Sequence, residues 1–325
     1  MNTMELERFC STSRVVIVAG KGGVGKTTVT AALATAAARA GTSVLIVEVE
    51  GKSGLASAFG KPPLTYEEAE LHDGVTARTL TPDEALVEYL ETHGLRRISK
   101  RLVKSGALDV VSTAVPGMKD ILVLGKVKAL DVESRFDLII VDAPAAGHAL
   151  TFLTSPRGLI DAVKVGPINA QAQAVIEMLS DPERCQVMLV TIPEETPVNE
   201  LVETAYALED RVGIQLGPVV INGCAPAVVG LEGKAPTIDD IESDAGTADV
   251  FIRDSEALDL AAAAAFRAER HTLQREQADR LADRLPLPQI RLPFLYTADL
   301  GRAEVETLAD VFATEVRSLP QPVTA

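Results

Sequence analysis

The chain alternates between two kinds of hydrophobic pattern along most of its length. Apolar runs typical of buried strands lie at residues 14–19, 42–50, 75–80, 136–142, 185–191, 216–222 and 288–292. Segments with apolar residues at helical spacing lie between or after them, at residues 29–39, 198–212, 254–285 and 302–319. Because strands that alternate with helices form parallel sheets, the pattern predicts an α/β fold with a doubly wound, mostly parallel sheet.

Two helical blocks interrupt this alternation, at about residues 82–132 and 150–179. They predict a helical subdomain inserted around the sheet. The whole pattern is that of a single domain over residues 14–319, with an N-terminal tail at 1–13 and a C-terminal tail at 320–325.

The last third of the chain carries two further features. Residues 223–248 are rich in glycine, proline and acidic residues, which is typical of an insertion. The helix predicted at 254–285 carries an apolar stripe, made of Leu258, Ala261, Ala265, Phe266, Leu273 and Leu281.

A glycine-rich turn joins the first predicted strand to the first predicted helix. It reads Gly20-Lys21-Gly22-Gly23-Val24-Gly25-Lys26-Thr27-Thr28. A strand, a glycine turn and a helix N-terminus in this order predict a phosphate-binding loop, whose backbone N–H groups face an anion. All of these residues are therefore candidates for binding a nucleotide. Lys26 is expected to reach the β- and γ-phosphates, and the Thr27 hydroxyl is expected to bind magnesium.

Polar residues follow the predicted strands where a doubly wound sheet binds its ligands, at the carboxyl ends. Asp142 ends an apolar strand, as the magnesium-side carboxylate of a phosphate-loop enzyme does. Glu50 stands where an acid can orient or deprotonate an attacking water, although a solvent-facing carboxylate is the alternative. Glu48 and Asn222 end two more strands, and Glu48 is a second candidate for holding magnesium waters.

Lys21 lies inside the glycine turn, where a simple phosphate loop needs no second lysine. Phosphoryl transfer gains from cations placed on the developing charge, often from another molecule, so Lys21 is a candidate to act across a dimer interface. The alternative is an additional surface charge near the phosphate.

Composition and charge limit the partners of the protein. The net charge of −15 over 325 residues argues against a nucleic-acid surface. The three cysteines, Cys10, Cys185 and Cys224, form no CxxC pair, so no structural zinc site is expected. The first residues lack the apolar core of a signal peptide, and no apolar run is long enough to span a membrane, so a cytoplasmic location is expected.

Several motifs together resemble one family. The loop at 21–28 resembles the deviant phosphate loop of dimeric ATPases that carry a second lysine. Residues 50–59 and 142–150 resemble the two switches of the arsenite-pump and tail-anchored-protein-targeting ATPases. Residues 292–295 and 299–301 are similar to their C-terminal adenine loop. The likeness covers about residues 14–319 in order, and it is closest to the bacterial, especially actinobacterial, members.

This resemblance implies an ATPase that uses ATP and Mg²⁺ and works as a homodimer or as a heterodimer with a homologous ATPase. It implies catalytic roles for Lys21, Lys26, Glu50 and Asp142, of which Lys21 is the intermolecular lysine. The metal ligands would be Thr27 and Asp142. Asn222 and Pro293 would contact the adenine. A membrane-protein or membrane-associated client is implied, but the metalloid-binding cysteines of the arsenite-pump members have no counterpart here.

Departures from the family pattern leave alternatives open. Glu50 replaces the usual aspartate, Gly54 offers no side chain at a position that usually touches nucleotide, and Ala145-Ala146 replaces a common proline and threonine. Slow turnover is therefore expected, and a regulatory subunit that binds ATP but hardly cleaves it is the alternative. A partition or septum-positioning ATPase is disfavoured because the segment 310–317 is not basic.

Overall fold

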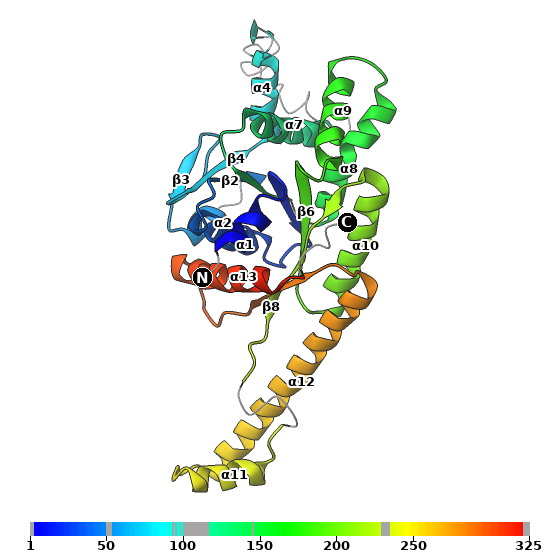
Figure 1. The fold of residues 1–325 in the computed structure, drawn as a ribbon. Coiled ribbons are helices and arrows are strands. Elements are labelled where there is room, and N and C mark those ends of the chain that lie inside the picture. Colours follow the sequence, from blue (N-terminus) through cyan, green and yellow to red (C-terminus); the bar gives the residue numbers. More distant parts are fainter. Residues whose placement is uncertain are drawn as a thin grey trace.

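The core of the molecule is one mostly parallel β-sheet, seen in a computed structural model with helices on both faces (Figure 1). The structure describes residues 3–49, 54–92, 94, 96, 97, 99, 117–144, 146–228 and 235–320. Within them the sheet has nine strands, in the order β3-β4-β2-β5-β1-β6-β8-β9, with β7 paired to β6 off this path. All pairs are parallel except β3 with β4. The predicted α/β class and doubly wound sheet are confirmed.

The strands are β1 (Val15–Gly20), β2 (Val44–Val49), β3 (Ala69–His72), β4 (Val75–Leu80), β5 (Leu138–Asp142), β6 (Cys185–Thr191), β7 (Gln215–Leu216), β8 (Val219–Cys224) and β9 (Gln289–Pro293). The helices are α1 (Thr3–Cys10), α2 (Lys26–Arg39), α3 (Gly54–Ala58), α4 (Pro82–Thr92), α7 (Met118–Glu133), α8 (Ala146–Ala162), α9 (Pro167–Ser180), α10 (Glu195–Val212), α11 (Ile238–Thr247), α12 (Asp254–Arg284) and α13 (Arg302–Ser318).

The central strands are apolar throughout because each of their faces is covered by helices. Successive side chains of a strand point to opposite faces. In β1, Val15, Ile17 and Ala19 therefore enter one hydrophobic cluster, with α7, α8, α9 and α10. Val16 and Val18 enter the other, with α1, α2 and α13. This two-sided burial fixes the position of β1 in the middle of the sheet, directly beneath the glycine-rich loop.

Two elements differ from the sequence expectations near the N-terminal half. Residues 3–10 form α1, where a tail was expected, and Phe9 contacts Phe312 of α13 with ring centroids 6.2 Å apart. An additional strand, β3, precedes the expected strand at 75–80 and pairs with it in antiparallel orientation. A turn with Gly74 at φ 76° joins the two strands, and Asp-Gly is a common hairpin turn sequence.

Helices α11 and α12 lie outside the sheet layers and project from the rounded body, with α11 at the far end (Figure 1). Helix α11 falls inside the segment 223–248 that was expected to be an insertion. Among the described residues, none of the helices combines the length and apolar character that a bilayer-spanning segment needs.

Candidate functional site

The glycine-rich loop connects the end of β1 to the start of α2. Gly23 and Gly25 have φ of 86° and 87°, in the left-handed region that glycine adopts without strain. Space is also limiting, since a Cβ atom at Gly20 would lie 2.3 Å from the Val190 carbonyl oxygen. At Gly25 it would lie 2.2 Å from Nδ2 of Asn222. The backbone can take this path only with glycine at these positions.

The loop leads into a helix N-terminus that favours an anion. Gly25 is the N-cap of α2, no side chain caps that fully described helix, and its first turn carries no acidic residue. The N–H groups of the first turn, together with the positive end of the helix dipole, therefore remain available to a phosphate. Lys26 is buried at the start of the helix, and its Nζ donates to the Lys21 carbonyl oxygen at 3.2 Å. Its side chain thus folds back over the loop.

Thr27 and Asp142, the two predicted magnesium ligands, lie next to each other. The Thr27 hydroxyl donates to Oδ2 of Asp142 at 2.6 Å. Asp142 is buried at the carboxyl end of β5, beside Val18 of β1 in the sheet register. A hydroxyl and a carboxylate are hard oxygen donors, which suit Mg²⁺.

Glu48 lies beside Asp142 in the sheet but makes a different contact. The two residues are register partners in β2 and β5, and Glu48 is also buried. Its Oε2 accepts a hydrogen bond from the Thr79 hydroxyl at 3.0 Å. This bond links Glu48 to β4. Glu50 and Ala145, whose roles were predicted from the sequence, lie outside the described residues. Gly54 is the first residue of α3, and a Cβ atom there would be 3.9 Å from Cγ2 of Thr27.

Asn222 and Pro293 come together at the carboxyl ends of β8 and β9. The Asn222 amide donates to the Val24 carbonyl oxygen at 2.9 Å, so it supports the loop directly. Pro293 pairs with Cys224, and the next residue, Phe294, donates its backbone N–H to the Cys224 carbonyl oxygen at 2.8 Å. Asn222 therefore borders the loop, and Pro293 lies at the end of the neighbouring strand β9; both are on the side opposite Asp142 in the strand order.

Lys21 makes an ion pair that the sequence did not indicate. Its Nζ lies 2.6 Å from Oε1 of Glu200, which is on α10. Both side chains are partly exposed, at 38% and 42%. Glu200 is one of several glutamates on an amphipathic helix, and nothing in its sequence context distinguishes it from the others.

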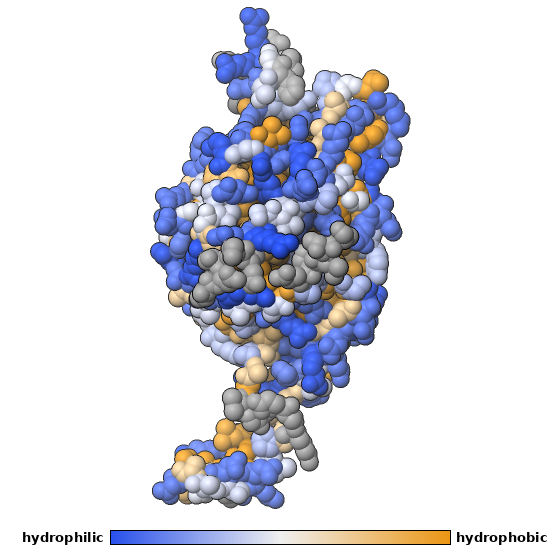
Figure 2. Space-filling view, in the orientation of Figure 1, coloured by the Kyte–Doolittle hydropathy of each residue, from blue (hydrophilic) through white to orange (hydrophobic). Residues whose placement is uncertain are grey.

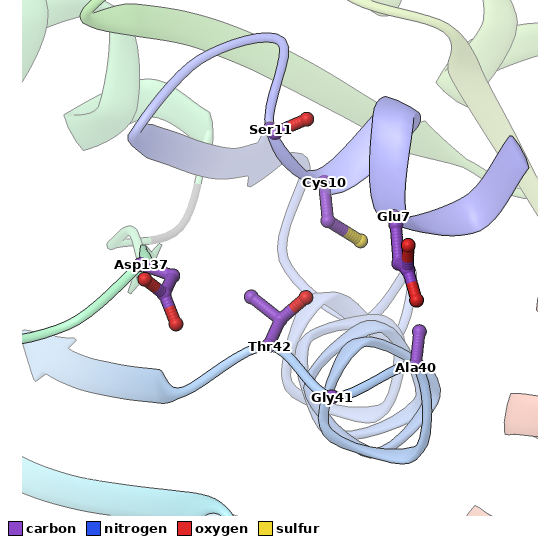
Figure 3. Close-up of a pocket in the computed structure, with 7 residues that line it drawn as sticks. All are labelled: Glu7, Cys10, Ser11, Ala40, Gly41, Thr42 and Asp137. Atoms are coloured by element: carbon purple, nitrogen blue, oxygen red, sulfur yellow. The ribbon is translucent and has the colours of Figure 1, made fainter. Parts of the chain in front are cut away.

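A separate pocket lies at the opposite edge of the sheet, where the strands begin (Figure 3). Its lining comes from the end of α1, the turn after α2 and the residue before β5, and consists of Glu7, Cys10, Ser11, Ala40, Gly41, Thr42 and Asp137. Burial raises the pKa of the Cys10 thiol to about 12, so this cysteine is a poor nucleophile at neutral pH. The pocket lies at the end of the strands opposite the loop and is therefore separate from the site built around the loop.

The cysteines and acidic residues form no separate metal centre in the described part of the chain. Groups of three or more His, Cys, Asp or Glu residues with metal-binding geometry are absent there. All three cysteines are free thiols. Desolvation by burial also raises the pKa of Cys185 and raises that of Cys224 to about 11.

Comparisons with known proteins agree with these features. The family described as anion-transporting ATPase matches residues 13–168. ATPase BagA of Mycobacterium tuberculosis is 33% identical over 308 residues, which is 89% of each chain. The arsenical pump-driving ATPase of Escherichia coli is 27% identical over 234 residues, covering 64% of this chain and 39% of that protein. ATPase get3 of Schizosaccharomyces japonicus is 30% identical over 169 residues, 51% of each chain.

Proposed function

This chain belongs to the anion-transporting ATPase family, and we propose that it binds ATP with Mg²⁺ and hydrolyses it slowly, as a dimer whose nucleotide state controls a partner or client surface. The observation that carries this proposal is the pairing of Thr27 with Asp142 at 2.6 Å beneath a glycine loop of left-handed φ. Phosphate-loop enzymes require a hydroxyl and a strand-end carboxylate side by side at this place.

Each part of the site has a separate role in binding ATP and the metal. The loop N–H groups and the α2 N-terminus bind the phosphates, and Lys26 turns from the Lys21 carbonyl towards the β- and γ-phosphates. Thr27 and Asp142 would hold the metal, which when bound would supply positive charge close to the phosphates. Lys21 leaves Glu200 and reaches the nucleotide of the partner subunit. Asn222 holds the loop in place, and Pro293 borders the base.

ATP binding is the first test. A fluorescent ATP analogue titrated onto the purified chain measures affinity, and phosphate release measures turnover. Lys26→Ala is expected to weaken binding about tenfold or more, because a charge-assisted contact to phosphate is lost. Lys164→Ala removes a lysine that is 74% exposed and far along the chain from the loop, and it should change neither quantity. Equal affinity in the two variants would refute the proposed phosphate site.

The metal role of Thr27 needs a separate measurement. Thr27→Ala removes the hydroxyl, whereas Thr27→Ser keeps it, so the two variants differ in the proposed ligand. The magnesium concentration that gives half-maximal turnover should be higher for Thr27→Ala than for the wild type. For Thr27→Ser it should equal that of the wild type. Identical magnesium dependence in both variants would remove Thr27 from the metal site.

A second candidate function is a regulatory subunit that binds ATP and lends Lys21 to a homologous ATPase. The position of Gly54 supports it, because this residue lies beside Thr27 and has no side chain to offer to a nucleotide. Binding of ATP without turnover, followed by turnover only after a homologous ATPase is added, would identify this function. The client is proposed to be a membrane protein or a membrane-associated protein.

A further inference from the structure

The arm, residues 235–277, leaves most of its helical surface uncovered. It comprises α11 and most of α12, which has 31 residues and is about 46 Å long at 1.5 Å per residue. Between residues 255 and 277 the only buried side chain is Ala257, and burial resumes at Ala278 and Leu281, where α12 meets the body. A helix of this length normally buries an apolar face, so the exposed portion requires an explanation.

One side of this exposed helix is apolar. Leu258, Phe266 and Leu273 are 56%, 65% and 53% exposed. At about 100° per residue they fall within about 80° of one another around the helix. Ala262 and Ala265 lie on the same side. The spacing of 258, 262, 265, 269 and 273 alternates mainly between four and three residues, which is the spacing of a coiled-coil seam. We call this surface the arm seam.

The charges within the arm seam are negative, whereas those on the other sides of α12 are mixed and include Arg275. Glu269 and Glu276 lie within it by the same helical geometry, and Arg270 lies at its edge. Arg267 points elsewhere, since its guanidinium lies 5.4 Å from the Tyr296 ring centroid. Beyond the seam, residues 237–260 contain a single basic residue, Arg253, and eight acidic ones: Asp239, Asp240, Glu242, Asp244, Asp249, Asp254, Glu256 and Asp259.

The negative charge limits the kinds of molecule that can bind to the arm seam. An acidic surface repels nucleic acid and anionic lipid. Two copies of the chain in parallel register would place Glu269 against Glu269, which a coiled-coil seam disfavours. In the space-filling view, hydrophobic and hydrophilic residues lie next to each other on the arm (Figure 2).

We propose that the arm seam pairs with an amphipathic helix of another protein, which supplies apolar side chains to Leu258, Phe266 and Leu273 and lysine or arginine to Glu269 and Glu276. Helix-in-groove and coiled-coil recognition use this combination of apolar anchors and flanking charge. The inference rests on the arm alone and is independent of the proposed ATP chemistry.

The test uses a defined probe and the full chain. The probe is a labelled three-heptad peptide with leucine at the a and d positions and lysine at e and g, which prevents it from pairing with itself. Fluorescence anisotropy measures its Kd. Leu258→Ser with Phe266→Ser and Leu273→Ser should raise the Kd at least about tenfold, because the apolar anchors are lost. Leu260→Ser is the matched control: this residue is 50% exposed on the opposite side of α12, and its loss should leave the Kd within about twofold.

A charge exchange tests the acidic part of the proposal. Glu269→Lys with Glu276→Lys should weaken binding of the lysine peptide about tenfold. The same variant should strengthen binding of a peptide with glutamate at e and g. Glu242→Lys with Asp244→Lys on α11 changes the net charge equally and should shift either peptide by no more than about threefold. All of these variants are expected to fold because every altered side chain is exposed. Circular dichroism checks this.

Four outcomes would overturn the proposal. The seam triple variant could bind the lysine peptide as wild type does, or a lysine peptide with serine at a and d could bind equally well. Sedimentation could find a dimer of the chain that the triple variant abolishes, which would make a second copy the occupant. Vesicles of 30% phosphatidylserine could bind the chain through the seam residues, which would make a membrane the occupant.

Discussion

The Lys21 ammonium lies 2.6 Å from the Glu200 carboxylate, so the second lysine of the loop is held by its own chain. Both side chains are partly exposed, and an ion pair of this kind stabilises a protein by about 0–1 kcal/mol at most. Such a weak bond keeps Lys21 in place while it is idle but does not prevent its release. We expect Glu200 to compete with any other carboxylate or phosphate for Lys21.

Glu200→Gln is therefore expected to increase nucleotide-dependent dimer formation. Removing a competitor worth up to about 1 kcal/mol strengthens association by at most about fivefold for each Lys21 that crosses the interface. Analytical ultracentrifugation with a non-hydrolysable ATP analogue measures the change. Glu203→Gln is the control, because Glu203 is an exposed glutamate on the same helix three residues further along. Weaker association in Glu200→Gln than in Glu203→Gln would mean that Glu200 supports the dimer instead.

Gly25→Ala should disable the loop for two physical reasons. A left-handed φ costs a non-glycine residue about 1–2 kcal/mol, and the added Cβ would lie 2.2 Å from the Asn222 amide nitrogen. Gly41→Ala is the matched control, with φ at 92° and open space around the new Cβ. Urea unfolding should show a loss of stability in both variants, larger in Gly25→Ala because of the additional contact, and ATP affinity should fall only in Gly25→Ala. Unchanged ATP affinity in Gly25→Ala would contradict the proposed loop geometry.

Asn222→Asp should weaken nucleotide binding through the loop backbone. The amide of Asn222 donates to the Val24 carbonyl at 2.9 Å, and a carboxylate there presents only acceptors, at a cost of about 1–3 kcal/mol. Asn169→Asp makes the same chemical change at another asparagine, whose amide donates to the Val163 carbonyl at 2.7 Å in α9. Both variants should unfold at lower urea concentration, and only Asn222→Asp should lose ATP affinity. Loss of affinity in both would indicate a global effect.

Cys224 should react slowly with iodoacetamide in the folded protein. Desolvation by burial raises its pKa to about 11, and the thiolate is the reactive form. The thiol stays protonated below this pKa, so at pH 8 alkylation should be roughly a hundredfold slower than in urea, where the usual pKa of about 8.5 applies. The folded rate should rise about tenfold per pH unit from pH 8 to pH 10. Mass spectrometry of the tryptic peptide follows the reaction, and a folded rate that is flat with pH would exclude this account.

The sequence predicted the parts of the fold that depend on local pattern. The apolar runs of the central strands and the glycine turn at 20–28 specify burial on two faces and a loop of unusual φ, and these requirements are visible in the residues themselves. The strand-end rule also located Thr27 beside Asp142, because parallel strands place their carboxyl ends at one edge.

Long-range contacts could not be predicted in the same way. Glu200 looks like any solvated glutamate until the fold brings α10 beside the loop. Glu48 is a candidate to hold magnesium waters, and its hydrogen bond to Thr79 could not be predicted because it depends on which strand lies next to β2. The stripe on α12 is equally apolar whether it is buried or exposed, so Leu258 and Leu281 could not be told apart from spacing alone.

The C-terminal end of α12 is hydrogen-bonded to α10, the helix whose Glu200 forms the ion pair with Lys21. Arg280 and Arg284 both donate to Oδ1 of Asn199, at 2.8 and 2.7 Å, and Asn199 is the residue before Glu200. The residue of α10 that binds α12 is therefore next in sequence to the residue that pairs with the loop lysine. Adjacent residues of α10 thus hold the two features, Asn199 the C-terminal end of α12 and Glu200 the loop lysine, so a shift of α10 would alter both contacts together.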